Sequence, residues 1–323
     1  LGDGSAVFIN EDGWSISETP PILFRRFSHQ QLQVRPQTGG NLKDFCSFVN
    51  LSTENQKLLF LVYTVAAFIP DSPHPILVLY GPQGAGKSTP QRLLKRLVDP
   101  SVIKTLSSPD NIREFVQLAS HHYFLFLDNL SYLRGWLSDS LARACTGDGF
   151  TKRELFSDDD DIIYSFQRTI CLNGINLVIS RADLLDRCIL LPLDRIPKDK
   201  RRKEKDFWDD FETKQPLLLG AIFDAVAGAL REYPNIHLDS YPRMADFAAW
   251  GAAIAKVLGY TQEEFLAAYW ENVNQQNEAA LEASNVAIAI IAFMADREIW
   301  KGTASDLLTE LETVAGQIKI STK

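Results

Sequence analysis

The stretch from Gly81 to Ser88 (GPQGAGKS) is the part of the sequence best suited to bind an anion. It fits the pattern G-x-x-x-x-G-K-[ST] at every fixed position. Glycines allow a backbone to curl with its N–H groups pointing inward, and a following helix adds the positive end of its dipole. A lysine and a hydroxyl at the last two positions suit nucleotide phosphates and their Mg²⁺. We therefore expect ATP and Mg²⁺ to bind here, through Gly81, Gln83, Gly84, Ala85, Gly86, Lys87, Ser88 and Thr89.

An acidic residue follows a second strongly apolar segment, Tyr123–Leu127. Asp128 stands where a nucleotide site needs a carboxylate for Mg²⁺, so we expect Ser88 and Asp128 to be the metal-side residues. The next residue, Asn129, can orient a water molecule but cannot accept its proton. The alternative interpretation of Asp128-Asn129 is a turn that ends a strand.

Two further polar residues flank expected strands. Asn173 ends a strand that begins near residue 169, and its amide could align an attacking water; a simple Asn-Gly turn is the alternative. Arg187 precedes the strand after that, where an arginine could meet the charge of a phosphoryl group held by a neighbouring subunit. A structural ion pair with Asp183 or Asp186 is the alternative for Arg187. The order of the glycine-rich loop, Asp128, Asn173 and Arg187 along the chain is stronger evidence for a nucleotide site than any one of these features.

Apolar runs that alternate with helical periodicity predict an α/β fold, with a parallel sheet covered by helices on both faces. Its strands are expected at 75–80, 102–106, 123–127, 168–173 and 187–193, and its helices at 42–49, 54–68, 87–98, 109–120 and 134–145. Helices alone are expected later, at 199–213, 216–232, 242–258, 262–276, 284–297 and 303–315.

These patterns divide the chain into a β-rich tail or cap (1–40), an ATPase core (41–196), a helical lid or bundle (197–298) and a short last segment (299–323). The first part contains an expected hairpin, 7–10 with 14–17, and ends at 36–40 in a linker or a loop into the next unit. The last segment is either the start of a winged helix or one more helix of the bundle. Because residue 1 is Leu, we expect the chain to begin inside a longer protein.

Composition excludes several classes of protein. Of the 323 residues, 46% are hydrophobic and 23% charged, which is ordinary for a globular protein and unlike a disordered chain. No apolar stretch reaches the length of a membrane span, and widely spaced cysteines indicate reduced thiols in the cytoplasm. The net charge of −8 restricts any nucleic-acid contact to a local channel or loop. We interpret the charged run 198–205 as a solvated helix face.

At this point the chain resembles a known family. The segments GPQGAGKST, YFLFLDN, TGDGFTKRELF, ICLNG and LLDRCILLPL are similar to the AAA+-type core of superfamily 3 helicases. The likeness is closest to the helicase portion of phage- and plasmid-type primase–helicases and their relatives on bacterial mobile elements. It covers roughly residues 75–195, and PRMADFAAWG and WKGTASDLL extend it more loosely towards the C-terminus.

The resemblance implies a homo-oligomeric ring, most often a hexamer, that holds ATP between subunits and moves along single-stranded DNA from 3′ to 5′. It also implies a primase or polymerase domain elsewhere in the full-length protein. By motif, Lys87 and Ser88 are the Walker A residues and Asp128 is the Walker B acid. Asn173 is then the sensor 1 residue, and Arg187 the arginine finger. Arg243 is either a lid residue or a surface arginine.

The chain departs from that family in two places. Asn129 replaces the usual second acid, so either the catalytic base lies elsewhere or hydrolysis is slow. A hairpin expected at 151–166, which would enter the pore, carries four aspartates at 158–161, and these repel a phosphate backbone. Lys152 and Arg153 at its base either contact DNA or neutralise the aspartates.

Two functions follow. The leading hypothesis is an ATP-hydrolysing ring motor on single-stranded DNA in the replication of a phage, plasmid or other mobile element. The alternative is an ATP-gated assembly or interaction protein with little or no translocation, which the acidic character and Asn129 favour.

Overall fold

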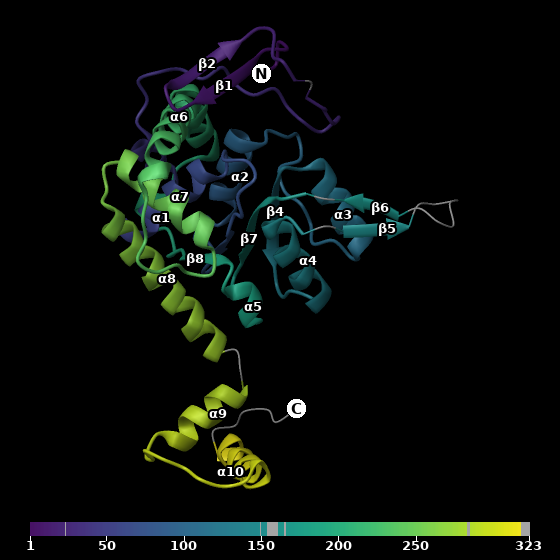
Figure 1. Cartoon of the computed structure of the whole chain (residues 1–323), viewed down its shortest axis with the longest axis vertical. Coiled ribbons are helices and arrows are strands. Elements are labelled where there is room, and N and C mark those ends of the chain that lie inside the picture. The colour runs from purple at the N-terminus through teal and green to yellow at the C-terminus, as the bar shows by residue number, and fades with distance from the viewer. Residues whose placement is uncertain (23, 149, 154–160, 165, 283–284, 318–323) are drawn as a thin grey trace.

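The computed structural model describes residues 1–22, 24–148, 150–153, 161–164, 166–282 and 285–317. Figure 1 shows an α/β body with an N-terminal hairpin on one side and two helices, α9 and α10, at the opposite end. The strands are β1 (Ala6–Asn10), β2 (Gly13–Ser17), β3 (Ile76–Tyr80), β4 (Phe124–Leu130), β5 (Phe150–Arg153), β6 (Asp161–Tyr164), β7 (Thr169–Gly174) and β8 (Cys188–Pro192).

The helices are α1 (Glu54–Ala66), α2 (Ser88–Val98), α3 (Ile112–His121), α4 (Gly135–Thr146), α5 (Ala182–Leu185), α6 (Glu204–Glu232), α7 (Ala245–Val257), α8 (Gln262–Glu282), α9 (Asn285–Met294) and α10 (Ala304–Gln317). Three short 3₁₀ helices are η1 (Leu42–Phe48), η2 (Lys198–Lys200) and η3 (Tyr233–Asn235).

The central sheet has four parallel strands in the order β4-β7-β3-β8. Its strands are apolar and almost wholly buried, because helices flank the sheet and remove both faces from water. The expected α/β class with a parallel sheet flanked by helices is therefore confirmed. Since the strands are parallel, their carboxyl ends meet at one edge, and the loops after β3, β4 and β7 lie there together.

The expected strand at 102–106 is wrong. Only Leu106 forms a bridge, to Leu127 of β4, so this segment touches the outer edge of the sheet without becoming a strand. Val102 is exposed and donates its N–H to the carbonyl of His29 in the N-terminal segment. A β-branched apolar residue suggested a strand here, but the N-terminal segment supplies its partner instead.

One helix replaces the two expected at 199–213 and 216–232. Helix α6 continues through Pro216, although a proline inside a helix removes one hydrogen bond. Phe211 on one side and Leu218 and Leu219 on the other are buried, and this packing outweighs the local cost. The carbonyl of Pro216 also accepts the N–H of Gln37, 2.9 Å away.

The hairpin expected in the first segment is confirmed, since β1 and β2 pair in an antiparallel ladder with Asn10 opposite Gly13. It lies against α6, where Trp14 donates to Asp224 at 2.8 Å (Figure 1). Residues 36–40, expected to be a linker or a loop into the next unit, form a loop that packs against α6. A Cβ on Gly220 would lie 1.8 Å from the carbonyl oxygen of Gln37, so only glycine permits this contact.

Helices α6, α7 and α8 share one core with the sheet. Helix α1 begins with a capping box between Thr53 and Gln56 and packs on α6, α7 and α8. The same buried cluster contains sheet residues such as Val78 and helical residues such as Phe247. The four cysteines are all free thiols, as expected, and three of them are buried.

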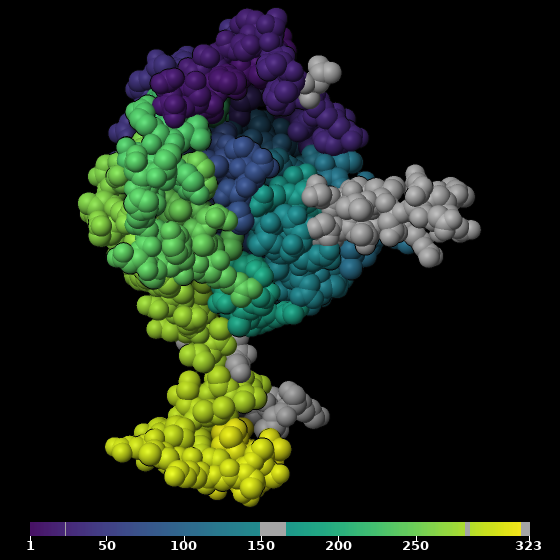
Figure 2. All heavy atoms as spheres, in the orientation of Figure 1, coloured from purple at the N-terminus to yellow at the C-terminus, as the bar shows by residue number. Residues whose placement is uncertain are grey.

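Helices α9 and α10 stand apart from this core. They pack on each other, and Trp300 meets Phe293 edge to face at 5.9 Å. Figure 2 shows them as a separate lobe beyond the end of α8. Among the described residues no single helix is long and apolar enough to cross a membrane; only the bent pair Gln262–Leu281 and Asn285–Met294 passes such a test, on length and composition alone.

Candidate functional site

The glycine-rich loop joins the end of β3 directly to the start of α2. Three of its glycines adopt positive φ, with Gly81 at 148°, Gly84 at 80° and Gly86 at 77°. A side chain at Gly81 would also meet the carbonyl oxygen of Leu193 at 2.1 Å. Glycine is required at these positions because the chain must turn sharply and pass close to the segment that follows β8.

Lys87 folds back over this loop. Its Nζ donates to the carbonyl oxygens of Gly81 at 2.7 Å and Pro82 at 3.0 Å. Partial burial lowers the pKa of Lys87, and the nearby carboxylate of Asp128 opposes that shift. The ammonium therefore lies at the loop, has no ion pair with a described residue, and keeps a donor available for an anion.

Ser88, Asp128 and Asn173 converge below the loop. The hydroxyl of Ser88 donates to Asp128 Oδ1 at 2.9 Å, and the Asn173 amide donates to the same oxygen at 2.6 Å. Asn173 is 1% exposed, so its side chain is fixed inside the protein. These residues come from α2, β4 and β7, and the parallel sheet brings them together as the sequence predicted.

Gln91 belongs to this cluster, although the sequence analysis did not single it out. It is fully buried on α2, one turn after Ser88, and its Oε1 accepts from Asn173 at 2.7 Å. Its own amide lies 3.4 Å from the carbonyl of Leu127 and 3.3 Å from that of Cys171. The helical spacing Ser88 to Gln91 was the available signal, because both residues lie on the face of α2 that meets the sheet.

A β-bulge directs Asp128 towards Ser88. The pairing of β4 with β7 shifts register between Leu127 and Leu130, and Asn129 adopts a left-handed φ of 55°. Its N–H donates to Asn173 Oδ1 at 2.7 Å. Bulges of this kind redirect side chains beside functional sites, and asparagine tolerates the left-handed region better than most residues. The exposed side chain of Asn129 is thus explained by backbone shape.

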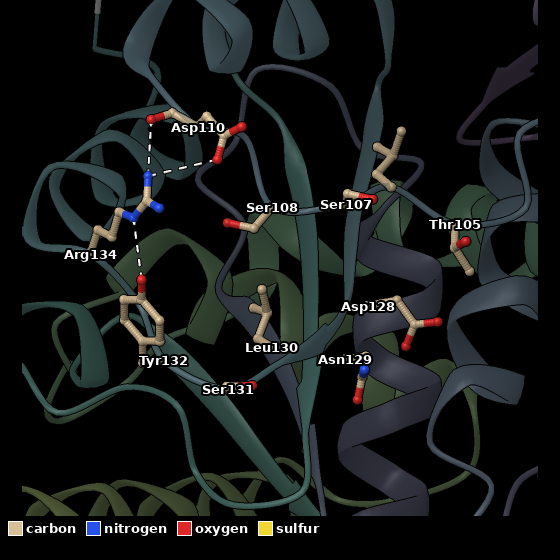
Figure 3. A pocket seen from close by; sticks show the side chains of 11 residues that line it. Thr105, Ser107, Ser108, Asp110, Asp128, Asn129, Leu130, Ser131, Tyr132 and Arg134 are labelled. Atoms are coloured by element: carbon tan, nitrogen blue, oxygen red, sulfur yellow. Dashed lines mark hydrogen bonds and ion pairs between the residues drawn. The ribbon is translucent and has the colours of Figure 1, made fainter.

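A pocket of about 480 Å³ opens beside this bulge. Figure 3 shows Asp128 and Asn129 on one side of it, and Arg134 with Asp110 on the other. Arg134 donates to the carbonyl of Asp110 at 3.1 Å and lies 3.8 Å from its carboxylate. Serine and threonine side chains line much of the remaining wall, at Thr105, Ser107, Ser108 and Ser131.

Arg187 lies at the other edge of the sheet. It precedes β8, level with the start of β3, whereas the glycine-rich loop follows the end of β3. Its guanidinium is 3.5 Å from Asp183, which also pairs with Arg243 at 2.6 Å. The ion-pair alternative for Arg187 thus has a contact in the structure. Its Nε is buried without a hydrogen-bond partner among the described residues. Arg243 also pairs with Asp186 at 3.4 Å, and among the described residues it has no ion pair or hydrogen bond at the loop.

The expected hairpin exists in its described part. Strands β5 and β6 pair antiparallel, with Lys152 opposite Ile162 and Arg153 opposite Asp161. It projects from the body beside α3 (Figure 1). Residues 154–160, and with them Asp158 to Asp160, lie outside the described residues. The predicted contacts of Lys152 and Arg153 with DNA stay predictions.

The residues present fit Mg²⁺ with a nucleotide. Mg²⁺ prefers oxygen ligands and is usually held by one or two carboxylates together with substrate phosphates. Ser88 Oγ and Asp128 Oδ1 supply two such oxygens 2.9 Å apart, at the base of a loop that can receive phosphates.

The chain belongs to the family of replication proteins of actinomycete integrative conjugative elements. The family model, described as actinomycete integrative conjugative element replication protein, matches residues 42–278. This range includes the glycine-rich loop, Asp128 and Asn173. The expectation of a replication protein from a mobile element is therefore confirmed. Among proteins with curated descriptions, none matches the chain.

Solved structures show a related fold. The apo C-terminal region of NrS-1 overlaps 93% of this chain at 13% identity, with a TM-score of 0.50. This chain spans 64% of the length of that structure. A second apo structure of the same region scores 0.47 at 13% identity, covering 90% of this chain and 66% of that one. A third structure, of JCV helicase with a bound phenylacetamide compound, scores 0.31 at 13% identity and covers 68% of this chain and 71% of that one. The last two scores are too low to support an argument.

Proposed function

We propose that this chain binds and hydrolyses ATP with Mg²⁺ and that it is an AAA+-like P-loop ATPase. The convergence of Ser88, Asp128 and Asn173 below the glycine-rich loop carries this proposal. If Asp128 and Asn173 only formed turns at the ends of their strands, their side chains would not need to contact each other and the Ser88 hydroxyl. The cluster supplies a metal ligand set and an orienting amide in one place.

Each residue has a separate role in this proposal. Loop N–H groups and Lys87 bind the phosphates, and Ser88 and Asp128 hold Mg²⁺, which neutralises charge on the phosphates when bound. Asn173 and Gln91 keep the Asp128 carboxylate oriented. Asn129 can position the attacking water through its exposed amide but cannot take the proton. Hydrolysis is therefore slow, or the base comes from elsewhere.

We further propose that the chain is a superfamily 3-type helicase that acts as a homo-oligomeric ring. This proposal rests on the order of the motifs and on membership in a replication-protein family.

In this ring, identical subunits, most often six, hold ATP at their boundaries and move single-stranded DNA during replication of the mobile element. The motif order from the glycine-rich loop to Arg187 supports it, together with the family of replication proteins. Arg187 then acts on the ATP of the next subunit. A primase or polymerase domain elsewhere in the full-length protein and a place in the cytoplasm belong to the same proposal.

A second candidate function is ATP-gated assembly, in which ATP closes a ring or docks a partner and turnover is incidental. Asn129 favours it, because the bulge holds that position in a left-handed backbone where an amide replaces the usual acid. The two functions differ in one measurable property: a motor is stimulated by single-stranded DNA, and a gated assembly is not.

The first test is Lys87→Ala. We expect it to weaken ATP binding at least tenfold and to abolish hydrolysis, because it removes the only cation that the loop itself supplies. Binding is measured with a fluorescent ATP analogue, and turnover by phosphate release with and without single-stranded DNA. The oligomer size is recorded in the same buffer.

Lys205→Ala is the matched control, since Lys205 is an exposed helical lysine that pairs with Asp209 at 2.7 Å. It should leave binding and turnover unchanged. Unaltered ATP binding by Lys87→Ala would contradict the site. Binding that persists in the wild type with no stimulation by DNA would favour the gated assembly over the motor.

A further inference from the structure

The segment between β8 and α6, residues 193–203, lies directly against the glycine-rich loop; we call it the strap. The N–H of Ile196 donates to the carbonyl of Gly84 at 3.1 Å. A Cβ on Gly86 would lie 3.1 Å from Cδ1 of Ile196. Asn50 joins the two segments, since its amide donates to the carbonyl of Asp194 at 2.6 Å and lies 3.4 Å from that of Ala85. The strap is thus a second wall of the candidate site.

Two arginines of the strap are beside the loop. The position that a Cβ would take on Gly84 lies 3.5 Å from Nη2 of Arg201 and 3.8 Å from Nε of Arg195. Both side chains are exposed. Arg201 also donates through Nε to the carbonyl of Ile196 at 3.4 Å, and Ile196 is the residue that bonds to Gly84. Neither guanidinium has an ion pair with a carboxylate within the described part of the chain.

The neighbouring arginine, Arg202, is also exposed but has an acidic partner. Arg202 is turned towards α6, where it pairs with Asp210 at 3.0 Å and donates to the carbonyl of Asp206 at 3.3 Å. The solvated helix face expected at 198–205 is confirmed only for Glu204 and Lys205, which are exposed and lie in α6. Helix α6 begins only at Glu204, so the charged run lies mostly in the strap, where tertiary contacts place it.

We propose that Arg195 and Arg201 bind the phosphate oxygens of the nucleotide from the strap side, within the same subunit as the loop. This inference rests on the proposed ATP-binding function and extends it to residues outside the loop motif. A guanidinium presents paired donors that match phosphate oxygens, and two such groups without acidic partners beside the loop add to the positive charge of Lys87.

The same contacts connect the nucleotide to the helical part of the protein. The strap continues into α6, and α6 is tied to α2 by ion pairs from Arg92 to Glu204 at 3.1 Å and from Arg96 to Glu212 at 2.7 Å. An anion held by both loop and strap therefore restrains the start of α6 relative to α2. Loss of the strap arginines should weaken nucleotide binding without altering the fold, because both side chains are exposed.

The test compares Arg195→Ala, Arg201→Ala and the double variant with Arg202→Ala as the matched control. Affinities for ADP and ATP are measured at low and high salt, and thermal unfolding is recorded without nucleotide. We expect each strap variant to bind ADP and ATP about tenfold more weakly, and the affinity of the double variant to depend less on salt than that of the wild type. Arg202→Ala should bind as the wild type does, and the unfolding temperatures should agree.

Four results would overturn the inference. Equal affinities for the strap variants and Arg202→Ala would show that the arginines do not touch the nucleotide. Unchanged nucleotide affinity with lost binding to single-stranded DNA would assign them to a different ligand. If the wild type and the double strap variant bind nucleotide equally well and Lys87→Ala does not, the proposed function stands and only this inference is removed. A wild-type protein that binds neither nucleotide removes both.

Discussion

Asn173 is the residue that links the parts of the candidate site. Its amide contacts Gln91 and Asp128, and its Oδ1 accepts the backbone N–H of Asn129. A buried amide with these partners has one orientation, because any other leaves a donor or an acceptor unsatisfied inside the protein. Asn173 therefore fixes both the Asp128 carboxylate and the bulge that carries it.

The left-handed backbone at Asn129 gives a prediction at the residue scale. Asn129→Gly should leave the free energy of unfolding within a few tenths of a kcal/mol, since glycine adopts positive φ readily. Asn129→Val should lower it by about 1–3 kcal/mol, because a β-branched side chain is strained there. Denaturant unfolding of both variants measures the difference. Equal stabilities would mean that φ at this position is not a constraint.

At the scale of elements, close backbone contacts hold the N-terminal segment on α6. Gln37 bonds to Pro216, and the positions of Gly40 and Gly220 leave no space for side chains. A helix interior normally favours alanine over glycine by about 1 kcal/mol. The glycine at 220 is therefore retained for the approach of residues 36–40, and the segment is part of the fold.

Replacing a helical glycine by alanine usually raises the free energy of unfolding, but this contact predicts the opposite at Gly220. Gly220→Ala should destabilise the protein by about 1–3 kcal/mol, because the added methyl would overlap the carbonyl of Gln37. Gly316→Ala in α10 is the control, since nothing lies within 4 Å of the added Cβ, and it should be neutral or stabilising. Thermal or denaturant unfolding decides. A stabilised Gly220→Ala variant would show that residues 36–40 do not pack on α6.

At the scale of the whole molecule, the position of Arg187 bears on assembly. Arg187 and the glycine-rich loop lie at opposite ends of adjacent parallel strands, so about 15 Å of strand separates them. An arginine in that position cannot reach an anion bound at the glycine-rich loop of its own chain. The proposed role as an arginine finger requires a neighbouring subunit, whereas the ion pair with Asp183 requires none.

Mixing two inactive variants separates these roles. Lys87→Ala and Arg187→Ala should each abolish ATP hydrolysis, and mixtures should recover part of it, since some boundaries then combine an intact Lys87 with an intact Arg187. Turnover is measured against the mixing ratio. Mixing Arg187→Ala with a protein that carries both substitutions should give no such recovery. Absence of recovery at every ratio would leave Arg187 as a structural residue only.

The sequence by itself determined the local parts of this protein. Apolar runs predicted the strands β3, β4, β7 and β8 closely, because a strand buried on both faces needs continuous apolar residues. The glycine spacing likewise predicted the loop, since few other residues permit its backbone. The sequence also allowed the prediction that Asp128 and Asn173 lie close together, because parallel strands end at one edge of a sheet.

Only the tertiary structure decided which distant segments meet. Gln91 joins the site because α2 turns one face to the sheet, and Arg201 lies at the loop because the strap folds back over it. The single helix through Pro216 and the docking of residues 36–40 on it depend on packing that no local pattern records. Such contacts join residues far apart in the chain, and their free energy comes from surfaces that exist only once the chain has folded.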